Sequence, residues 1–286
     1  MSTLRLEHDA GKAVGVFADN SLLCRYVYVS AEEPKESPRP YFHPLNSLAG
    51  DTLTNFRPND HPWHHGLSFT LTHVSGINFW GGPTCRREDG YQLRDDHGEQ
   101  RHTAWTECSA GGSRATLAHA LEWRTPAEKI FQEEREIAIA ADSSAGTWSL
   151  RWKARLRNVT GRELSLGNPH SFGGLPGSHY TGLQFRGARE LLDDHLDPTI
   201  RIVAEGGLEG DKAVHGASAR WMEWHGQLDE TLHRVVLRFE NNPGPLHWFV
   251  RRGYPLAAFP LQFDQDLKIA PRATLEVDHT LTFTAA

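Results

Sequence analysis

The chain has 286 residues, a formal net charge of −6 and 38% hydrophobic residues. It contains no Lys- or Arg-rich segment of the kind that binds nucleic acid, and no run of roughly 18 apolar residues that could cross a membrane. Three cysteines at wide spacing (Cys24, Cys85 and Cys108) argue against a disulfide framework or a cysteine-type zinc site. The first twenty residues lack a basic segment followed by an apolar one, so we expect a cytoplasmic protein that binds neither nucleic acid nor membrane.

Every element that we can predict along the chain is a β-strand. Apolar and polar residues alternate with period two over residues 67–73, 117–123, 148–157 and 275–283. This alternation is typical of strands with one covered and one wet face, whereas no segment has clear helical periodicity. Turn signals such as those around Gly90 and Gly98 separate the runs, without a linker or repeat. We therefore predict an all-β fold, a large antiparallel β-sandwich, built as a single domain from residues 1–286.

The most informative segment is residues 60–66 (Asp-His-Pro-Trp-His-His-Gly), which holds three imidazoles and a carboxylate. Pro62 disfavours helix, which excludes the helical zinc pattern of two histidines four residues apart, so we expect a loop or the start of a strand. Clustered imidazoles are costly to bury unless they carry protons, bind a metal or hold a ligand. We interpret His61 and His64 as a general acid and an electrophile, or as two metal ligands, and His65 as less central. The alternative is structural, with the imidazoles capping loop carbonyls in a buried polar corner.

Residues 131–139 add a carboxylate to the candidate site. If this segment is a strand, Glu133 and Arg135 share a face with the apolar side chains of Phe131, Ile137 and Ile139, and that face is the covered one. A charged pair on an inner face is costly unless it is paired or serves a ligand. We therefore predict a general base at Glu133 with Arg135 as a neighbouring cation. The alternative is a structural ion pair.

Further candidates have side chains suited to holding a polar, ring-shaped ligand. Sugars place their apolar ring faces on aromatic side chains while polar groups bond the hydroxyls. The candidates for substrate binding are Arg135 and, in addition, His43, Trp63, Trp80, His102, Arg186 and Trp248. Each has a structural alternative: a loop histidine bonded to backbone for His43, a solvated hairpin end for His102, surface solvation for Arg186 and core packing for each tryptophan.

Four segments together resemble one family. They are residues 39–44 (Arg-Pro-Tyr-Phe-His-Pro), 60–66, 78–83 (Asn-Phe-Trp-Gly-Gly-Pro) and 242–251, which contains Asn-Pro and His-Trp-Phe-Val-Arg. In this order they resemble the bacterial PmoA-like family of uncharacterised soluble proteins, over nearly the whole chain. The methane oxygenase subunit after which that family is named is an integral membrane protein, and this chain has no spanning segment. The resemblance implies a galactose-mutarotase-like supersandwich, whose members bind or process sugars on a concave sheet face, often with His and Glu as acid and base.

Three functions follow as hypotheses. The first is a carbohydrate-active enzyme for isomerisation, epimerisation or elimination of a pyranose or oxidised sugar, in which Glu133 takes a proton and His61 or His64 gives one. The second is a metal-dependent lyase or oxygenase with His61, His64 and Glu133 as ligands of a divalent metal. The third is a non-catalytic sugar-binding protein. We expect no organic cofactor and a small-molecule sugar or sugar derivative as partner, and a homodimer stays open.

Overall fold

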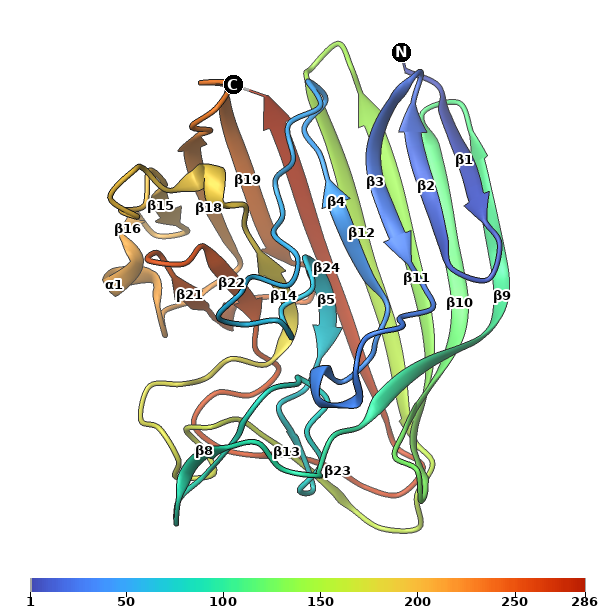
Figure 1. The fold of residues 1–286 in the computed structure, drawn as a ribbon, viewed down its shortest axis with the longest axis vertical. Coiled ribbons are helices and arrows are strands. Elements are labelled where there is room, and N and C mark those ends of the chain that lie inside the picture. Colours follow the sequence, from blue (N-terminus) through green and yellow to red (C-terminus); the bar gives the residue numbers. More distant parts are fainter. Residues whose placement is uncertain (1, 286) are drawn as a thin grey trace.

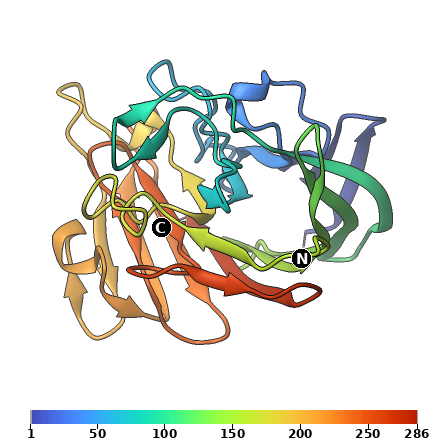
Figure 2. The ribbon, with the colours of Figure 1, turned by 90° about the horizontal axis from the view of Figure 1, so that it is seen from below.

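The computed structural model describes residues 2–285 and consists almost entirely of β-strands. Two large antiparallel sheets lie face to face (Figure 1), and the view from below shows them as two layers (Figure 2). Within the described residues, helix is limited to α1 (Asp211–Val214) and two 3-10 turns, η1 (Pro34–Glu36) and η2 (Arg189–Leu191). None of these helices is long and apolar enough to span a bilayer. The predicted antiparallel β-sandwich is confirmed.

The larger sheet has nine strands, and its long central members carry the alternation seen in the sequence. In β12 (Thr147–Asn158), Trp148, Leu150 and Trp152 are buried, whereas Arg151 and Arg155 are exposed. The predicted strands at 117–123, 131–139, 148–157 and 275–283 all belong to this sheet. In spatial order its members are β16 (Leu208–Glu209), β15 (Arg201–Ala204), β18 (Trp221–Gln227), β19 (Arg234–Asn241), β24 (Thr274–Ala285), β12, β11 (Lys129–Asp142), β10 (Arg114–Arg124) and β9 (Glu99–Gly111).

The second sheet has eight shorter strands. In spatial order they are β1 (Leu4–Asp9), β2 (Ala13–Ala18), β3 (Ser21–Val27), β4 (Tyr41–Leu45), β5 (Leu67–Thr70), β14 (Gly182–Arg186), β22 (Leu256–Phe259) and β21 (Phe249–Arg251). The predicted strand at 67–73 is divided, because β5 ends at Thr70 and the chain then joins another sheet. That small sheet contains β6 (His73–Val74), β13 (Leu164–Gly167) and β23 (Leu267–Ile269), and two further strand pairs are β7 (Thr84–Arg86) with β8 (Gly90–Gln92) and β17 (Ser218–Ala219) with β20 (Leu246–His247).

Large aromatic side chains from both sheets fill the space between them. Trp123, Trp152 and Trp224 of the larger sheet are fully buried, as are Phe42 and Phe69 of the smaller one. Each aromatic side chain that is removed from water contributes about 4–6 kcal/mol as an upper estimate, given 150–250 Å² of surface and about 25 cal/mol per Å². This layer therefore holds the two sheets together.

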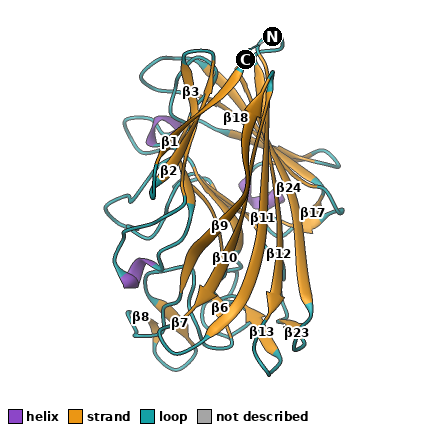
Figure 3. Ribbon diagram, turned by 90° about the vertical axis from the view of Figure 1, so that its right-hand side faces the viewer, coloured by secondary structure: helices purple, strands orange, loops and turns teal. Residues whose placement is uncertain are grey.

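The outer faces of the two sheets differ. On the nine-stranded sheet the outward side chains are polar and exposed, as in β12. On the eight-stranded sheet the outward side chains of Ser68, Gln184 and Arg186 are buried, and loops gather on that side of the molecule (Figure 3). The smaller sheet is thus covered on both faces at β5, β14 and β22, and its loop-covered face holds the candidate site.

Candidate functional site

A pocket of about 400 Å³ lies on the loop-covered face, beside β21 and β22. This volume is within the usual range for small-molecule sites. Two imidazoles (His61 and His64) and one cation (Arg251) line it, and among the described lining residues none is Asp or Glu. Its aromatic lining consists of Trp63, Trp80, Tyr91, Tyr180, Phe249 and Tyr254.

A larger groove of about 790 Å³ lies on the outer face of the nine-stranded sheet. Its charged side chains pair with one another, since Arg155 contacts Glu134 at 3.1 Å and Glu276 at 3.0 Å. No Trp, Tyr or Phe is among its described lining residues. We therefore take the smaller, aromatic pocket as the candidate site.

The loop before β5 places the side chains of His61 and His64 on the same side of the loop, facing the pocket. The His61 N–H donates to the Pro58 carbonyl at 3.0 Å, and the His64 N–H donates to the His61 carbonyl at 2.9 Å. These successive turns stack the two imidazoles, with ring centroids 4.8 Å apart and planes 26° apart. The predicted loop is confirmed, and the two histidines that the sequence singles out line one pocket.

The loop is fixed from below by Arg39, whose side chain is fully buried. Its guanidinium donates to the Trp63 carbonyl at 2.6 Å and to the Ser68 hydroxyl at 3.1 Å. From the side, Gly82 (φ +68°) packs against the Trp63 indole, where a Cβ would lie 2.3 Å from ring atoms. Only glycine fits there without displacing the indole, so the position of Trp63 depends on both contacts.

Trp80 is held in place by a neighbouring amide. The Asn78 side-chain oxygen accepts from the N–H groups of Trp80 (2.8 Å) and Gly81 (2.9 Å). The indole meets His64 edge-on, with centroids 5.9 Å apart, and packs against Tyr180 at 4.9 Å. Trp63 and Trp80 both line the pocket, and their role in substrate binding stays a prediction.

His64 is 3% exposed, and its Nδ1 has no hydrogen-bond partner among the described residues. Burial lowers the pKa of His64 well below its usual value, and the Arg186 cation lowers it further. His64 is therefore neutral at physiological pH. A neutral imidazole can accept a proton or donate a hydrogen bond, which favours these roles over the predicted role of acid.

His61, unlike His64, is partly exposed and lies beside a carboxylate. Its side chain is 32% exposed, and its Nδ1 lies 2.9 Å from Oδ2 of Asp60, an ion-pair distance without the alignment of a hydrogen bond. The imidazole also stacks on Tyr254, with ring centroids 5.6 Å apart. His61 thus has a carboxylate beside it and access to solvent, which suits a group that exchanges protons with a substrate.

Two polar side chains of β14 lie on the same face as the pocket. Arg186 is 4% exposed, its guanidinium lies 4.7 Å from the Tyr254 ring centroid, and its Nε has no partner among the described residues. Burial lowers the pKa of Arg186, and Asp60 opposes the shift. Gln184 is fully buried, and neither of its amide atoms has a partner within residues 2–285. Surface solvation, the alternative for Arg186, is wrong, and buried polar groups of this kind suit a ligand that completes their hydrogen bonds.

The prediction that Trp248 lines the site is wrong, because its side chain is fully buried in the core between the two sheets. Its neighbours Phe249 and Arg251, which were not predicted, line the pocket instead. In an extended segment Trp248 points to the opposite face from Phe249. Because both faces carry apolar side chains here, alternation in the sequence does not show which of the two residues faces the pocket. Tyr180 and Tyr254 stand alone in the sequence, and no motif there points to them.

Glu133 and Arg135 lie on the covered face of β11, as predicted, and form a fully buried ion pair. Arg135 Nε donates to Glu133 Oε1 at 2.6 Å, and Nη2 donates to Oε2 at 2.8 Å. The Trp123 indole N–H also donates to Oε2, at 2.6 Å, while Arg135 reaches the Tyr26 hydroxyl and the Gln100 side chain at 3.0 Å. Every charged atom of the pair has a partner inside the core.

The predicted shared site of this pair with the histidines is therefore wrong. Glu133 and Arg135 lie between the sheets, whereas His61 and His64 lie on the outer face of the eight-stranded sheet. Burial lowers the pKa of Arg135, but the facing Glu133 carboxylate outweighs it and leaves that pKa above its usual value. The structural ion pair, which the sequence left as an alternative, is the arrangement seen.

His43 and His102 are also absent from the residues that line the pocket. His43 Nδ1 lies 3.0 Å from the Thr54 hydroxyl, and burial lowers its pKa to about 4. His102, on β9, has its Nδ1 2.9 Å from Nδ1 of His119, a residue of the inner face of β10. Both predictions of substrate binding are corrected by these contacts, which serve the fold.

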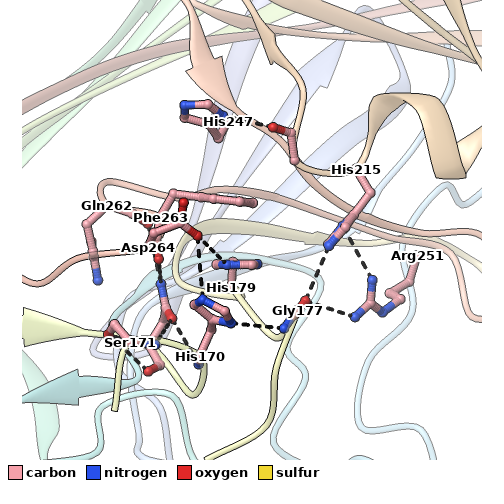
Figure 4. A network of polar contacts seen from close by, with 12 residues as sticks. His170, Ser171, Gly177, His179, His215, His247, Arg251, Gln262, Phe263 and Asp264 are labelled. Atoms are coloured by element: carbon pink, nitrogen blue, oxygen red, sulfur yellow. Dashed lines mark hydrogen bonds and ion pairs between the residues drawn. The ribbon is translucent and has the colours of Figure 1, made fainter. Parts of the chain in front are cut away.

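The predicted metal ligands His61, His64 and Glu133 do not come together, because a β-sheet separates the carboxylate from the imidazoles. Within residues 2–285, one group of three His, Cys, Asp or Glu side chains has ligand atoms within 4.8 Å of one another, and it consists of His170, His179 and Asp264. This group (Figure 4) was not predicted from the sequence.

We compared the chain with solved structures, with curated proteins and with models of protein families. Among solved structures, the chain is similar to the polysaccharide lyase BACCELL_00875, with 10% identity and a TM-score of 0.36 over 100% of this chain and 33% of the lyase. The chain thus spans a third of the length of that protein. It is also similar to the Slr1438 protein from Synechocystis sp. PCC 6803, with 12% identity and a TM-score of 0.38 over 100% of this chain and 96% of the other. No curated protein matches the sequence. Residues 13–285 match a family model, and the chain therefore belongs to the family of unknown function DUF6807.

Proposed function

We propose that this chain is carbohydrate-active, and that its pocket binds a pyranose or oxidised sugar on which His61 and His64 transfer protons. The observation that carries the proposal is a stacked pair of imidazoles inside an aromatic pocket, beside a buried guanidinium. The reaction would be isomerisation, epimerisation or elimination, and it needs no organic cofactor.

The aromatic lining supports a ring-shaped ligand. A sugar ring can lie on Trp63 or Tyr254, with its hydroxyls toward polar groups at the edge of the pocket. Tyr91 and Tyr180 offer hydroxyl groups that lie 3.0 Å apart. The PmoA-like resemblance and the mutarotase-like sandwich that it implies are predictions that point to the same class of ligand.

The charge of the pocket favours an oxidised sugar with a carboxylate. Arg251 lines the pocket, and Arg186, which is not among its lining residues, packs against the lining residue Tyr254 and has an Nε without a partner among the described residues. A bound carboxylate would offset the cation that lowers the pKa of His64, and so would make that imidazole a stronger base once substrate has arrived.

The two histidines then have separate roles. His64, neutral in the free protein, accepts a proton from the substrate, and His61, beside Asp60, donates one to a neighbouring atom on the same face of the sugar or to a leaving oxygen. The metal-dependent alternative loses its support, because Glu133 lies in the core. A sugar-binding protein without turnover has the same aromatic lining and is the second candidate.

The test is a panel of neutral pyranoses and the corresponding uronates, followed by NMR for turnover and by calorimetry for affinity. His64→Ala should lower turnover by roughly 10²- to 10⁴-fold while affinity changes much less. His195→Ala, at an exposed loop position, is the control and should change neither. Binding of uronates without turnover would favour the binding protein, and unchanged turnover in His64→Ala would refute the proton-transfer role.

A further inference from the structure

A second cluster of titratable side chains lies in loops outside the pocket (Figure 4). His179 Nε2 is 3.2 Å from Asp264 Oδ1, and His170 Nε2 is 3.6 Å from the same oxygen. The centroids of the two imidazoles are 4.3 Å apart. Three donor atoms thus surround one point.

The loops that carry these residues are tied together. The Asn168 side chain donates to the Phe263 carbonyl at 2.8 Å, and it accepts from the His170 N–H at 3.0 Å. The Phe263 ring stacks on the His179 imidazole, with centroids 3.6 Å apart and planes 7° apart. His179 is 5% exposed, and its Nδ1 has no partner among the described residues. The ring is therefore fixed in position although its hydrogen bonding is incomplete.

We propose that His170, His179 and Asp264 bind a divalent transition-metal ion such as Zn²⁺. Two imidazole nitrogens and one carboxylate oxygen suit such ions, whereas Ca²⁺ and Mg²⁺ prefer oxygen ligands only. Donor atoms bound at about 2.0–2.2 Å from one ion lie about 2.8–3.6 Å apart in tetrahedral or octahedral geometry, and the two nitrogen–oxygen distances, 3.2 and 3.6 Å, reach that range. The Asp264 side chain is 72% exposed, so an ion can reach the site from solvent.

Binding requires one change at His170. Its Nδ1 accepts a hydrogen bond from the Gly177 N–H at 3.0 Å, which places the proton of the neutral ring on Nε2. A metal ion takes the lone pair of Nε2, so the proton moves to Nδ1 and the Gly177 N–H must turn away. The metal-bound and metal-free forms therefore differ in the tautomer of His170 and in the orientation of the Pro176–Gly177 peptide.

Gly177 also contacts the wall of the candidate pocket. Its carbonyl accepts from His215 Nε2 at 3.2 Å and from Arg251 Nη2 at 3.4 Å, and Arg251 lines the pocket. The Gly177 N–H belongs to the Pro176–Gly177 peptide and this carbonyl to the Gly177–Ser178 peptide, so the two groups are joined only through the backbone dihedrals of Gly177. The metal site and the pocket wall thus meet at one residue, and the proposed metal site does not depend on the proposed sugar chemistry.

The first experiment is calorimetric titration of untagged protein with ZnCl₂, with metal content measured after dialysis. We expect one ion per chain. Asp264→Asn and His170→Ala, both at partly or well exposed positions, should weaken binding by more than the roughly 10- to 100-fold that loss of an outer-shell partner costs. His247→Ala, which removes an imidazole 5.0 Å from Phe263 but outside the triad, should leave binding unchanged. The proposal would be overturned if the parent bound no Zn²⁺, or if Asp264→Asn and His170→Ala bound Zn²⁺ as tightly as the parent does.

The second experiment reads the tautomer of His170 by long-range ¹H–¹⁵N NMR. Zn²⁺ should move the His170 proton from Nε2 to Nδ1 and shift the Gly177 amide resonance. If saturating Zn²⁺ leaves the proton on Nε2, then His170 is not a ligand and the proposed triad is wrong.

Discussion

Replacing Glu133 by Gln tests whether the Glu133 carboxylate has a structural or a catalytic role. The Glu133 carboxylate accepts three hydrogen bonds, two from Arg135 and one from Trp123, and all of them lie in the core. Gln keeps one acceptor oxygen, removes the charge and turns an amide N–H₂ toward a guanidinium. The Arg135 cation then has no counter-charge, and breaking a buried pair in this way costs about 3–5 kcal/mol of unfolding free energy.

The effect can be measured by thermal denaturation. An unfolding entropy of about 2.1 cal/mol/K per residue gives about 0.6 kcal/mol/K for 286 residues, so a loss of about 4 kcal/mol lowers Tm by about 7 °C. The control is Glu134→Gln on the same strand, where the carboxylate is 72% exposed and contacts Arg155 at 3.1 Å. This control should shift Tm by no more than about 1 °C. Equal shifts in the two variants would refute the structural role.

The double variant Glu133→Leu/Arg135→Met makes the test sharper. Removing both charges takes away the cost of the unpaired ion, and apolar side chains of similar volume often recover the lost stability. We expect the double variant to be more stable than Glu133→Gln, with any turnover retained. Loss of turnover in a stable double variant would return Glu133 to the list of catalytic candidates.

Three further predictions concern pH, the pocket wall and the pocket charge. Burial lowers the pKa of His279 to about 3, so the unfolded chain takes up that proton first, and the contribution of His279 to stability is complete above about pH 6.5 and falls by about 2 kcal/mol at pH 5. His43 and His64, whose pKa values burial also lowers, add to the loss in the parent, so urea titrations between pH 7 and pH 5 should show a loss in His279→Leu that is about 2 kcal/mol smaller than in the parent; equal losses would contradict the prediction. Gly82 and Gly90 share nearly the same φ (+68° and +69°), but only at Gly82 would a Cβ meet a side chain, so Gly82→Ala should lower Tm by about 2–5 °C more than Gly90→Ala; equal shifts would contradict the packing argument. Arg186→Met removes a cation that lowers the pKa of His64, so NMR titration should show that pKa raised; an unchanged pKa would place Arg186 too far away to act.

The sequence predicted those parts of the structure that depend on one face of one strand. Alternation in β10, β11, β12 and β24 predicted the sheet and the inward direction of Glu133 and Arg135, because only one face of that sheet is apolar. Alternation gives no such information at residues 247–251. There both faces are covered, so apolar side chains fall on each and Trp248 could not be told from Phe249.

The candidate site was predictable only where one loop carries it. His61 and His64 are three residues apart in successive turns, so local spacing brings their rings together. Arg251 and Tyr254 join them through strand order, which a single sequence does not reveal. Whether Glu133 faces the same cavity as His61 and His64 depends on whether a sheet lies between the carboxylate and the imidazoles. Alternation gives no information on how the two sheets are placed.

The double covering of β14 limits how this protein can change during evolution. All five of its residues are buried, with Leu183 and Phe185 in the core and Gln184 and Arg186 on the loop-covered face that also holds the pocket. A substitution on either face shifts a strand on which both the packing and the ligand site depend. New ligand preferences would therefore have to arise in the surrounding loops, whose residues can vary without moving the sheet, while β14 stays the same from one descendant to the next.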